Sequence, residues 1–119
     1  MAALTVENIP SPQKDETTGN LDVLVLTENA AASAGDTVAN DGRVIIMCRN
    51  THGSATRTIT FGGVVGPTGR DGDVVMTLTT GKIGIAGPFE KALWNSSGNI
   101  TVTYSDSGAD IKVGAMRYL

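Results

Sequence analysis

The chain has 119 residues, of which 40% are hydrophobic and 18% are charged, and its formal net charge is −3. A chain of this length forms one domain and buries roughly 65% of its unfolded surface, so a core can form without metal or disulfide. Sparse charge argues against a nucleic-acid-binding protein, because phosphate binding depends on clustered Lys and Arg. No apolar run approaches the roughly 18–20 residues that span a bilayer, and residues 1–20 lack the pattern of an export signal. We expect a soluble protein with no nucleic-acid or membrane partner.

The composition favours strands with few bulky side chains, joined by tight turns. The chain has 15 glycines and only 4% aromatic residues, and Val, Ile, Leu and Thr dominate its apolar runs. Helix formers cluster only in residues 28–34, which lack an apolar stripe and are too short to form a stable helix alone. That stretch makes one helical turn at most, and the predicted class is all-β.

Residues 1–20 divide into an apolar half and a polar half that contains prolines. Apolar side chains alternate weakly up to residue 9, and two prolines then prevent regular ladder pairing. One interpretation is a frayed chain end. The other is an extended arm, whose short apolar hook docks onto a neighbouring subunit from a proline-stiffened spacer. The candidate partner-binding residues of this arm are Leu4, Val6, Ile9, Pro10 and Pro12.

Residues 21–119 form a single predicted domain, which begins with a strand over residues 21–27. After a loose crossing, the pair Asp41-Gly42 marks a tight turn, because glycine supplies the positive φ that such turns require. The run RVIIMCR at residues 43–49 is apolar between its flanking arginines and is bounded by turns. It predicts a central strand buried on both faces.

Alternation of apolar and polar residues continues along the rest of the chain. It predicts strands over residues 57–61, 74–78, 82–86, 99–105 and 110–118. Ile83 and Ile85 share one face of their strand. The positions predicted to face inward are Ile59, Phe61, Val74, Met76, Leu78, Ile100, Val102, Tyr104, Ile111, Val113 and Ala115. About eight short strands at spacings near 8–12 residues indicate a jelly-roll-like antiparallel β-sandwich.

Residues for catalysis or metal binding are few. Cys48 and His52 could supply two zinc ligands, but a structural site needs four and the chain has no other Cys or His. A Cys–His nucleophilic pair is the other reading, yet strand alternation gives no reason for these side chains to converge. Asp71-Gly-Asp73 resembles part of a calcium loop but lacks further oxygen ligands, so a tight turn is the simpler reading. We predict a non-enzyme with no catalytic residue, metal or cofactor.

Trp94, the only tryptophan, is the remaining candidate partner-binding residue. It follows Phe89 and Leu93 just before a turn, and the simpler interpretation is a cap over one end of the sandwich. An exposed Trp94 would instead be an interface hot spot or a platform for stacking sugars.

Several short motifs together carry a resemblance to a known group of proteins. They are, in order, NDGR at residues 40–43, the strand at 57–61, GPF at 87–89, Asn95, NITVTYS at 99–105 and the ending RYL at 117–119. This order over residues 37–119 resembles small proteins encoded beside the major capsid protein in tailed bacteriophages, some of which are jelly-roll head decoration, or cement, proteins. Residues 1–20 and the glycine-rich residues 62–72 lie outside the resemblance.

The resemblance implies a structural virion protein that forms a homotrimer or homodimer. Such a protein is made in the host cytoplasm, binds the outer surface of the phage head and clamps adjacent major capsid proteins, which stabilises the shell. No catalytic residue comes with that role. The alternative is a carbohydrate- or receptor-binding β-sandwich module of a phage fibre or tail. It would need an exposed aromatic platform, whose candidates are Phe89, Trp94, Tyr104 and Tyr118.

Overall fold

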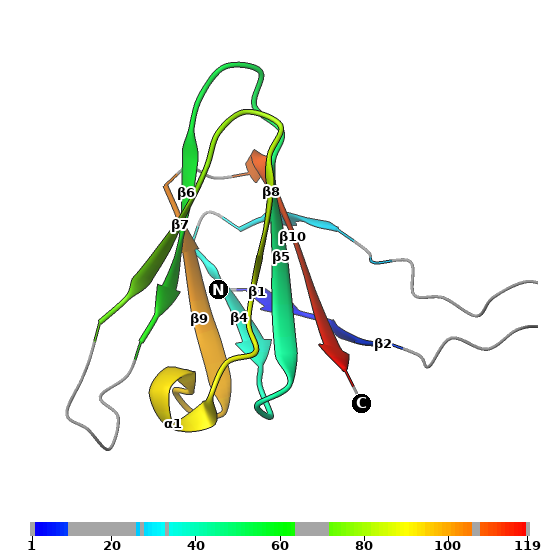
Figure 1. Ribbon diagram of the computed structural model, residues 1–119, viewed down its shortest axis with the longest axis vertical. Coiled ribbons are helices and arrows are strands. Elements are labelled where there is room, and N and C mark those ends of the chain that lie inside the picture. The colour runs from blue at the N-terminus through cyan, green and yellow to red at the C-terminus, as the bar shows by residue number, and fades with distance from the viewer. Residues whose placement is uncertain are drawn as a thin grey trace, which may run out of the picture.

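The computed structural model describes residues 2–9, 26, 28–32, 34–63, 72–105 and 108–118. These residues form an all-β sandwich of two mixed sheets with one short helix, which confirms the predicted class (Figure 1). The strands are β1 (Ala2–Leu4), β2 (Val6–Ile9), β3 (Asn29–Ala31), β4 (Asp36–Ala39), β5 (Val44–Asn50), β6 (Arg57–Gly62), β7 (Val74–Leu78), β8 (Ile83–Ala86), β9 (Asn99–Tyr104) and β10 (Gly108–Tyr118). The helix is α1 (Lys91–Trp94).

Sheet A has the strand order β1-β4-β9-β6-β7, and sheet B has the order β2-β10-β5-β8, with β3 also paired to β10. All pairs are antiparallel except β1 with β4 and β2 with β10. Both sheets are therefore mixed, and the predicted antiparallel pairing holds for the described pairs other than these two. Parallel partners need a long connection, and the chain between β2 and β10 provides it.

The N-terminal strands lie in both sheets of the chain's own sandwich. Thr5 alone separates β1 from β2, so one extended segment pairs with sheet A and then with sheet B (Figure 1). Leu4 and Val6 are half-buried and pack against the core. Residues 2–9 thus fold onto their own domain, because this position buries the two anchors. The rest of the predicted arm, including Pro10 and Pro12, lies outside the described residues.

The core lies between the sheets and follows the predicted alternation. All the predicted inward positions from residue 100 onward are buried except Tyr104, which is half-buried. Ile59 and Phe61 of β6 are also buried, as is Leu78 of β7. Val74 is an exception, since it begins an edge strand and is 53% exposed. Period-two alternation identified the inner face correctly wherever a strand has neighbours on both sides.

Strand β5 departs from the prediction on one face. Val44, Ile46, Cys48 and Asn50 are buried, but the residues between them are only partly buried. The prediction of burial on both faces is wrong, because no third layer of described residues covers the outer face of sheet B.

Two other expectations differ locally. The predicted helical turn near residue 30 contains strand β3, because pairing with β10 satisfies its backbone. The helix lies instead at α1, which closes one end of the sandwich beside β9 (Figure 1). The strand predicted over residues 21–27 lies almost wholly outside the described residues.

Candidate functional site

Cys48 and His52 do not form a reactive pair. Cys48 is fully buried in the core, and burial raises the pKa of its thiol to about 12, so it stays protonated at neutral pH. His52 lies in the loop after β5, where its Nδ1 accepts hydrogen bonds from the backbone N–H groups of Ser54 (3.0 Å) and Ala55 (2.8 Å). Within the described ranges, no cluster of three or more potential metal ligands occurs.

Asp73 has a structural position at the start of β7. Its carboxylate accepts a hydrogen bond from the backbone N–H of Gly63 (3.1 Å), which ties the start of β7 to the end of β6. Asp71 lies outside the described residues. The contact observed at Asp73 is that of a turn residue.

Trp94 packs on the end of the core. Its ring meets Phe89 edge to face at a centroid distance of 5.4 Å, and Phe89 lies 5.4 Å from Phe61. Phe89 is buried, Trp94 is half-buried, and Tyr104 donates a hydrogen bond to the buried Asp36 (2.5 Å). Of the chain's five aromatic residues, all of them described, only Tyr118 is largely exposed. No pair of rings forms the platform that sugar stacking needs.

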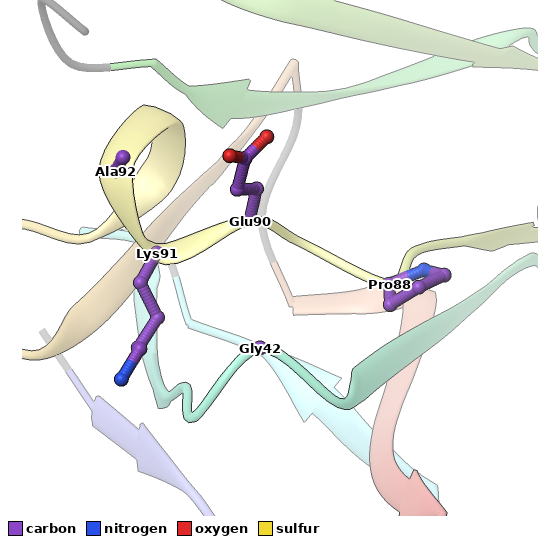
Figure 2. Close-up of a pocket in the computed structure, with 5 residues that line it drawn as sticks. All are labelled: Gly42, Pro88, Glu90, Lys91 and Ala92. Atoms are coloured by element: carbon purple, nitrogen blue, oxygen red, sulfur yellow. The ribbon is translucent and has the colours of Figure 1, made fainter. Parts of the chain in front are cut away.

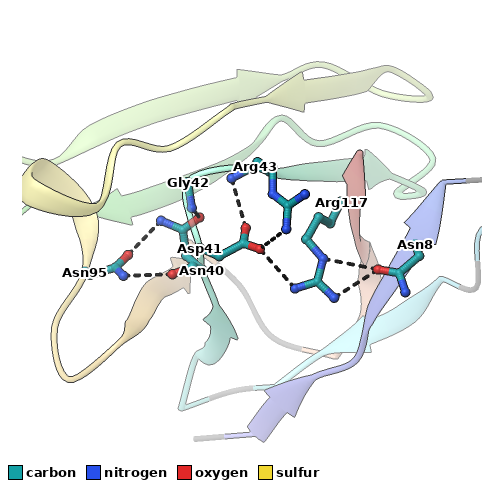
Figure 3. Close-up of polar contacts among 7 residues, drawn as sticks. All are labelled: Asn8, Asn40, Asp41, Gly42, Arg43, Asn95 and Arg117. Carbon is teal, nitrogen blue, oxygen red and sulfur yellow. Dashed lines mark hydrogen bonds and ion pairs between the residues drawn. The ribbon is translucent and has the colours of Figure 1, made fainter. Parts of the chain in front are cut away.

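Two asparagines fix the end of the sandwich that carries α1. The side-chain nitrogen of Asn40 donates to the carbonyl of Phe89 (2.9 Å) and to Oδ1 of Asn95 (2.7 Å). Its oxygen accepts from the N–H of Gly42 (3.0 Å), and Asn95 donates back to the Asn40 carbonyl (2.9 Å). Figure 3 shows the contacts of Asn40 with Gly42 and Asn95, which join the β4–β5 turn to the segment after α1.

An ion-pair network continues from this turn to the N-terminal strands. Asp41 pairs with Arg43 (2.8 Å) and with Arg117 of β10 (3.2 Å), and Arg117 also donates to Asn8 of β2 (Figure 3). The hydrogen bond from Arg43 holds the pKa of the Asp41 carboxyl below its usual value. Seven of the residues that carry the resemblance therefore meet here as framework contacts: Asn40, Asp41, Gly42, Arg43, Phe89, Asn95 and Arg117. The motif Asn40-Asp41-Gly42 predicts a turn, and asparagine side chains often cap such turns, which is the signal in the sequence for the role of Asn40.

Two depressions lie near this network. The larger, of about 500 Å³, is lined by Gly42, Pro88, Glu90, Lys91 and Ala92 (Figure 2). Glu90 and Lys91 point away from each other there, so no polar groups converge on a ligand. The smaller, of about 350 Å³, combines Leu4 and Val6 with the Asp41–Arg117 ion pair. That pair is satisfied within the chain, and neither depression presents a catalytic arrangement.

The outer face of sheet A is hydroxylated. Inward positions of β4, β6, β7 and β9 are apolar except Asp36 and Arg57, and the alternate positions point outward. Cross-strand register places these outward positions side by side, as in the pairs Thr60↔Thr103 and Thr58↔Thr77. We name this surface the threonine face. Its threonines are Thr37, Thr58, Thr60, Thr77, Thr101 and Thr103, and the exposed Val75 of β7 lies beside Thr60 on the same face.

The outer face of sheet B is apolar. Register aligns Ile85 with Met47 and Ile45 with Met116 across three neighbouring strands. Exposure reaches 66% for Ile85, 56% for Ile83 and 42% for Tyr118. We name this surface the apolar face; its residues are Ile45, Met47, Ile83, Ile85, Met116 and Tyr118. A contiguous apolar patch of this kind on an otherwise polar surface is typical of a protein-binding site.

The edge strands β7 and β8 adjoin the two faces. Neither strand contains a charged residue or a proline, the features that natural sheets use to prevent edge pairing. They pack against each other at Gly84, where an added Cβ would lie 2.4 Å from the Met76 sulfur. Both edge strands therefore lack the residues that prevent pairing with a strand of another chain.

Comparisons of this chain with protein-family models, with curated proteins and with solved structures found no match. In the described part of the chain, no helix has the length and apolar character to cross a membrane. The contrast between the two outer faces is thus the main functional observation.

Proposed function

We propose that this chain is a structural protein of a virion: a decoration, or cement, protein that binds the outside of a tailed-phage head and clamps adjacent major capsid proteins. The observation that carries the proposal is the polarity of the sandwich. One outer face is mostly threonine, with the exposed Val75 on its edge strand, and the other carries isoleucine, methionine and tyrosine, with Arg49 and Lys112 at one end. A subunit that works in an assembly turns an apolar face toward protein and a polar face toward water.

Two further observations support this proposal. Residues from several of the motifs that resemble cement proteins make the framework contacts around Asn40 and Asp41, which supports the proposal. The nucleophile and base that an enzyme would need do not meet at Cys48 and His52. The carbohydrate-binding alternative loses its platform, because Phe89 and Trp94 pack into the end of the core.

Such a protein acts by mass action. It binds the assembled lattice and not the free subunits, so each bound copy shifts the shell toward its closed state. Identical sites repeated over the lattice add avidity to modest individual contacts.

The test uses heads assembled from the major capsid protein encoded in the same genome. Purified full-length chain is mixed with expanded heads, with unexpanded heads and with free capsid protein, and binding is measured by co-sedimentation. We expect saturable binding to expanded heads only, together with a higher temperature of head disruption. Failure to bind expanded heads, or equal binding to free subunits, would contradict the proposal.

A further inference from the structure

We propose that residues 2–9 and β10 form a mechanical clamp, through which the domain bears tension directed along its strands. The source of the load is the proposed function, on which this inference rests: a protein that holds capsid subunits together carries tension when the shell is under pressure. The tension enters at the N-terminal end of β1 and leaves at the C-terminal end of β10. Strand direction, register and side-chain contacts at these two ends together resist it.

The direction of β2 relative to β10 sets how the force acts. The two strands are parallel, and β2 pairs with the end of β10 from Val6 to Ile9. Tension therefore pulls β2 toward its own start and β10 toward its own end, which are opposite directions along one ladder. All pairs of the ladder are loaded together in shear, whereas a force across the strands would open them one at a time. The parallel pairing of β1 with β4 is loaded along the strand in the same way.

Side chains strengthen the hold on residues 2–9. Leu4 of β1 and Val6 of β2 pack against the core, so the segment cannot slide along its partners without pulling these side chains out of contact. Arg117 of β10 donates hydrogen bonds of 3.1 and 2.9 Å to Oδ1 of Asn8, and it pairs with Asp41 at 3.2 Å (Figure 3). The guanidinium thus ties β2 to β10 and to the β4–β5 turn.

The next described strand along the chain, β3, is held differently. β3 is antiparallel to β10, and its first residue, Asn29, lies beside Val113. Once residues 2–9 have detached, the same tension peels β3 from β10 beginning at Asn29, so that these pairs break in turn. Detachment of residues 2–9 is therefore the step that sets the rate of unfolding under tension.

The first experiment stretches single full-length chains with optical tweezers in two directions. Handles at residues 1 and 119 pull along the clamp. A handle on Ile9→Cys, used with the handle at residue 119, opens the β2–β10 ladder from one end, because Ile9 and Tyr118 are paired. Cys48 is buried and does not compete for this handle, and circular dichroism checks that the variant is folded. We expect a several-fold higher unfolding force along the clamp, and equal forces in the two directions would overturn the inference.

The second experiment compares a variant in the clamp with a matched variant in the core. Asn8→Ala removes the bonds from Arg117, and Ile59→Val removes one methyl group from β6, which pairs with β7 and β9. Each should lower the equilibrium constant for folding by about fivefold in urea unfolding. Under tension along the clamp, Asn8→Ala should raise the unfolding rate at fixed force by about fivefold, because its contact is lost at the barrier. Ile59→Val should leave this rate nearly unchanged, because the core is intact when residues 2–9 detach.

The outcomes separate the clamp from a general effect on stability. Equal changes in the unfolding rate for Asn8→Ala and Ile59→Val would overturn the inference, as would no change for Asn8→Ala. Head binding is measured separately from the stretching experiments. A chain that ignores heads but resists tension only along the clamp overturns only the proposed function. A chain that binds heads but unfolds at the same force in both directions overturns only this inference.

Discussion

Asn40 is a buried polar side chain whose loss should lower the stability of the sandwich strongly. Asn40→Ala removes three hydrogen bonds, of 2.7, 2.9 and 3.0 Å, and leaves the buried Phe89 carbonyl without its partner. The bonds to Asn95 and Gly42 are worth about 1 kcal/mol net each, and the Phe89 carbonyl left unsatisfied costs about 1–3 kcal/mol, so we expect a loss of about 3–5 kcal/mol. For a domain of this size, that lowers the melting temperature by roughly 12 °C.

The assay is urea unfolding at constant pH, followed by circular dichroism. Asn40→Asp tests the donor side of the amide separately. The carboxylate keeps the acceptor for the Gly42 N–H, but it places a second acceptor against the oxygens of Phe89 and Asn95 where the amide nitrogen donated. We expect this variant to be at least as unstable as Asn40→Ala at pH 7, and to recover relative to it below about pH 4, where the acid is protonated and can donate.

Asn99→Ala is the matched control. Asn99 lies at the same end of the sandwich, and its side chain makes only a long 3.5 Å contact to the Ser97 carbonyl. Its loss should stay within about 0.5 kcal/mol. If Asn40→Ala costs no more than this control, the proposed role of the Asn40 network in stability is wrong.

Three further predictions concern glycines and the buried thiol. Gly87→Ala should lower the free energy of unfolding by at least about 3 kcal/mol, and Gly98→Ala by about 1 kcal/mol, as measured by thermal unfolding. Both glycines have positive φ, but only at Gly87 would the added Cβ clash, because it would lie 2.6 Å from a carbonyl oxygen of β5. Gly84→Ala should lower the free energy of unfolding by about 1–3 kcal/mol, because the added methyl displaces the Met76 sulfur. The loss should be smaller in a Met76→Ala background, and equal losses in both backgrounds would disprove the contact. Burial raises the pKa of the Cys48 thiol to about 12. The stabilisation by the protonated thiol is therefore fully present below about pH 9, and above that pH the free energy of unfolding falls by roughly 1.4 kcal/mol per pH unit. Cys48→Ala should flatten this decline between about pH 9 and 10, and an unchanged slope would contradict it.

Local periodicity was sufficient to find most strands and their inner faces. Residues 99–105 and 110–118 alternate strictly, and alternation depends only on the backbone, so Ile100 and Val113 could be placed without knowing their neighbours. Ile83 and Ile85 alternate in the same way, yet they face water. Alternation identifies the apolar face of a strand, but whether that face is buried depends on which other elements cover it, and that is set by the tertiary structure.

The candidate site was less accessible from the sequence. The apolar face exists only because β5, β8 and β10 are neighbours, and strand order is not encoded in alternation. Parallel pairing of residues 2–9 was missed for the same reason, since their partners lie far along the chain. The role of Asn40 was missed because its contacts reach Phe89 and Asn95, about fifty residues away.

The position of β10 in sheet B has a consequence for synthesis of the chain. β10 pairs with β2, β3 and β5, and all three precede it in the sequence. A nascent chain on the ribosome can therefore assemble β4, β6, β7 and β9 of sheet A first and pair β5 with β8, whereas β2 and β3, which pair with β10 in the described sheet, wait for it to emerge. Contacts so distant in sequence make folding slow, in the range of milliseconds to seconds. During that interval the strands of sheet B stay accessible to chaperones and to other chains, so folding yield should depend on how quickly translation reaches β10.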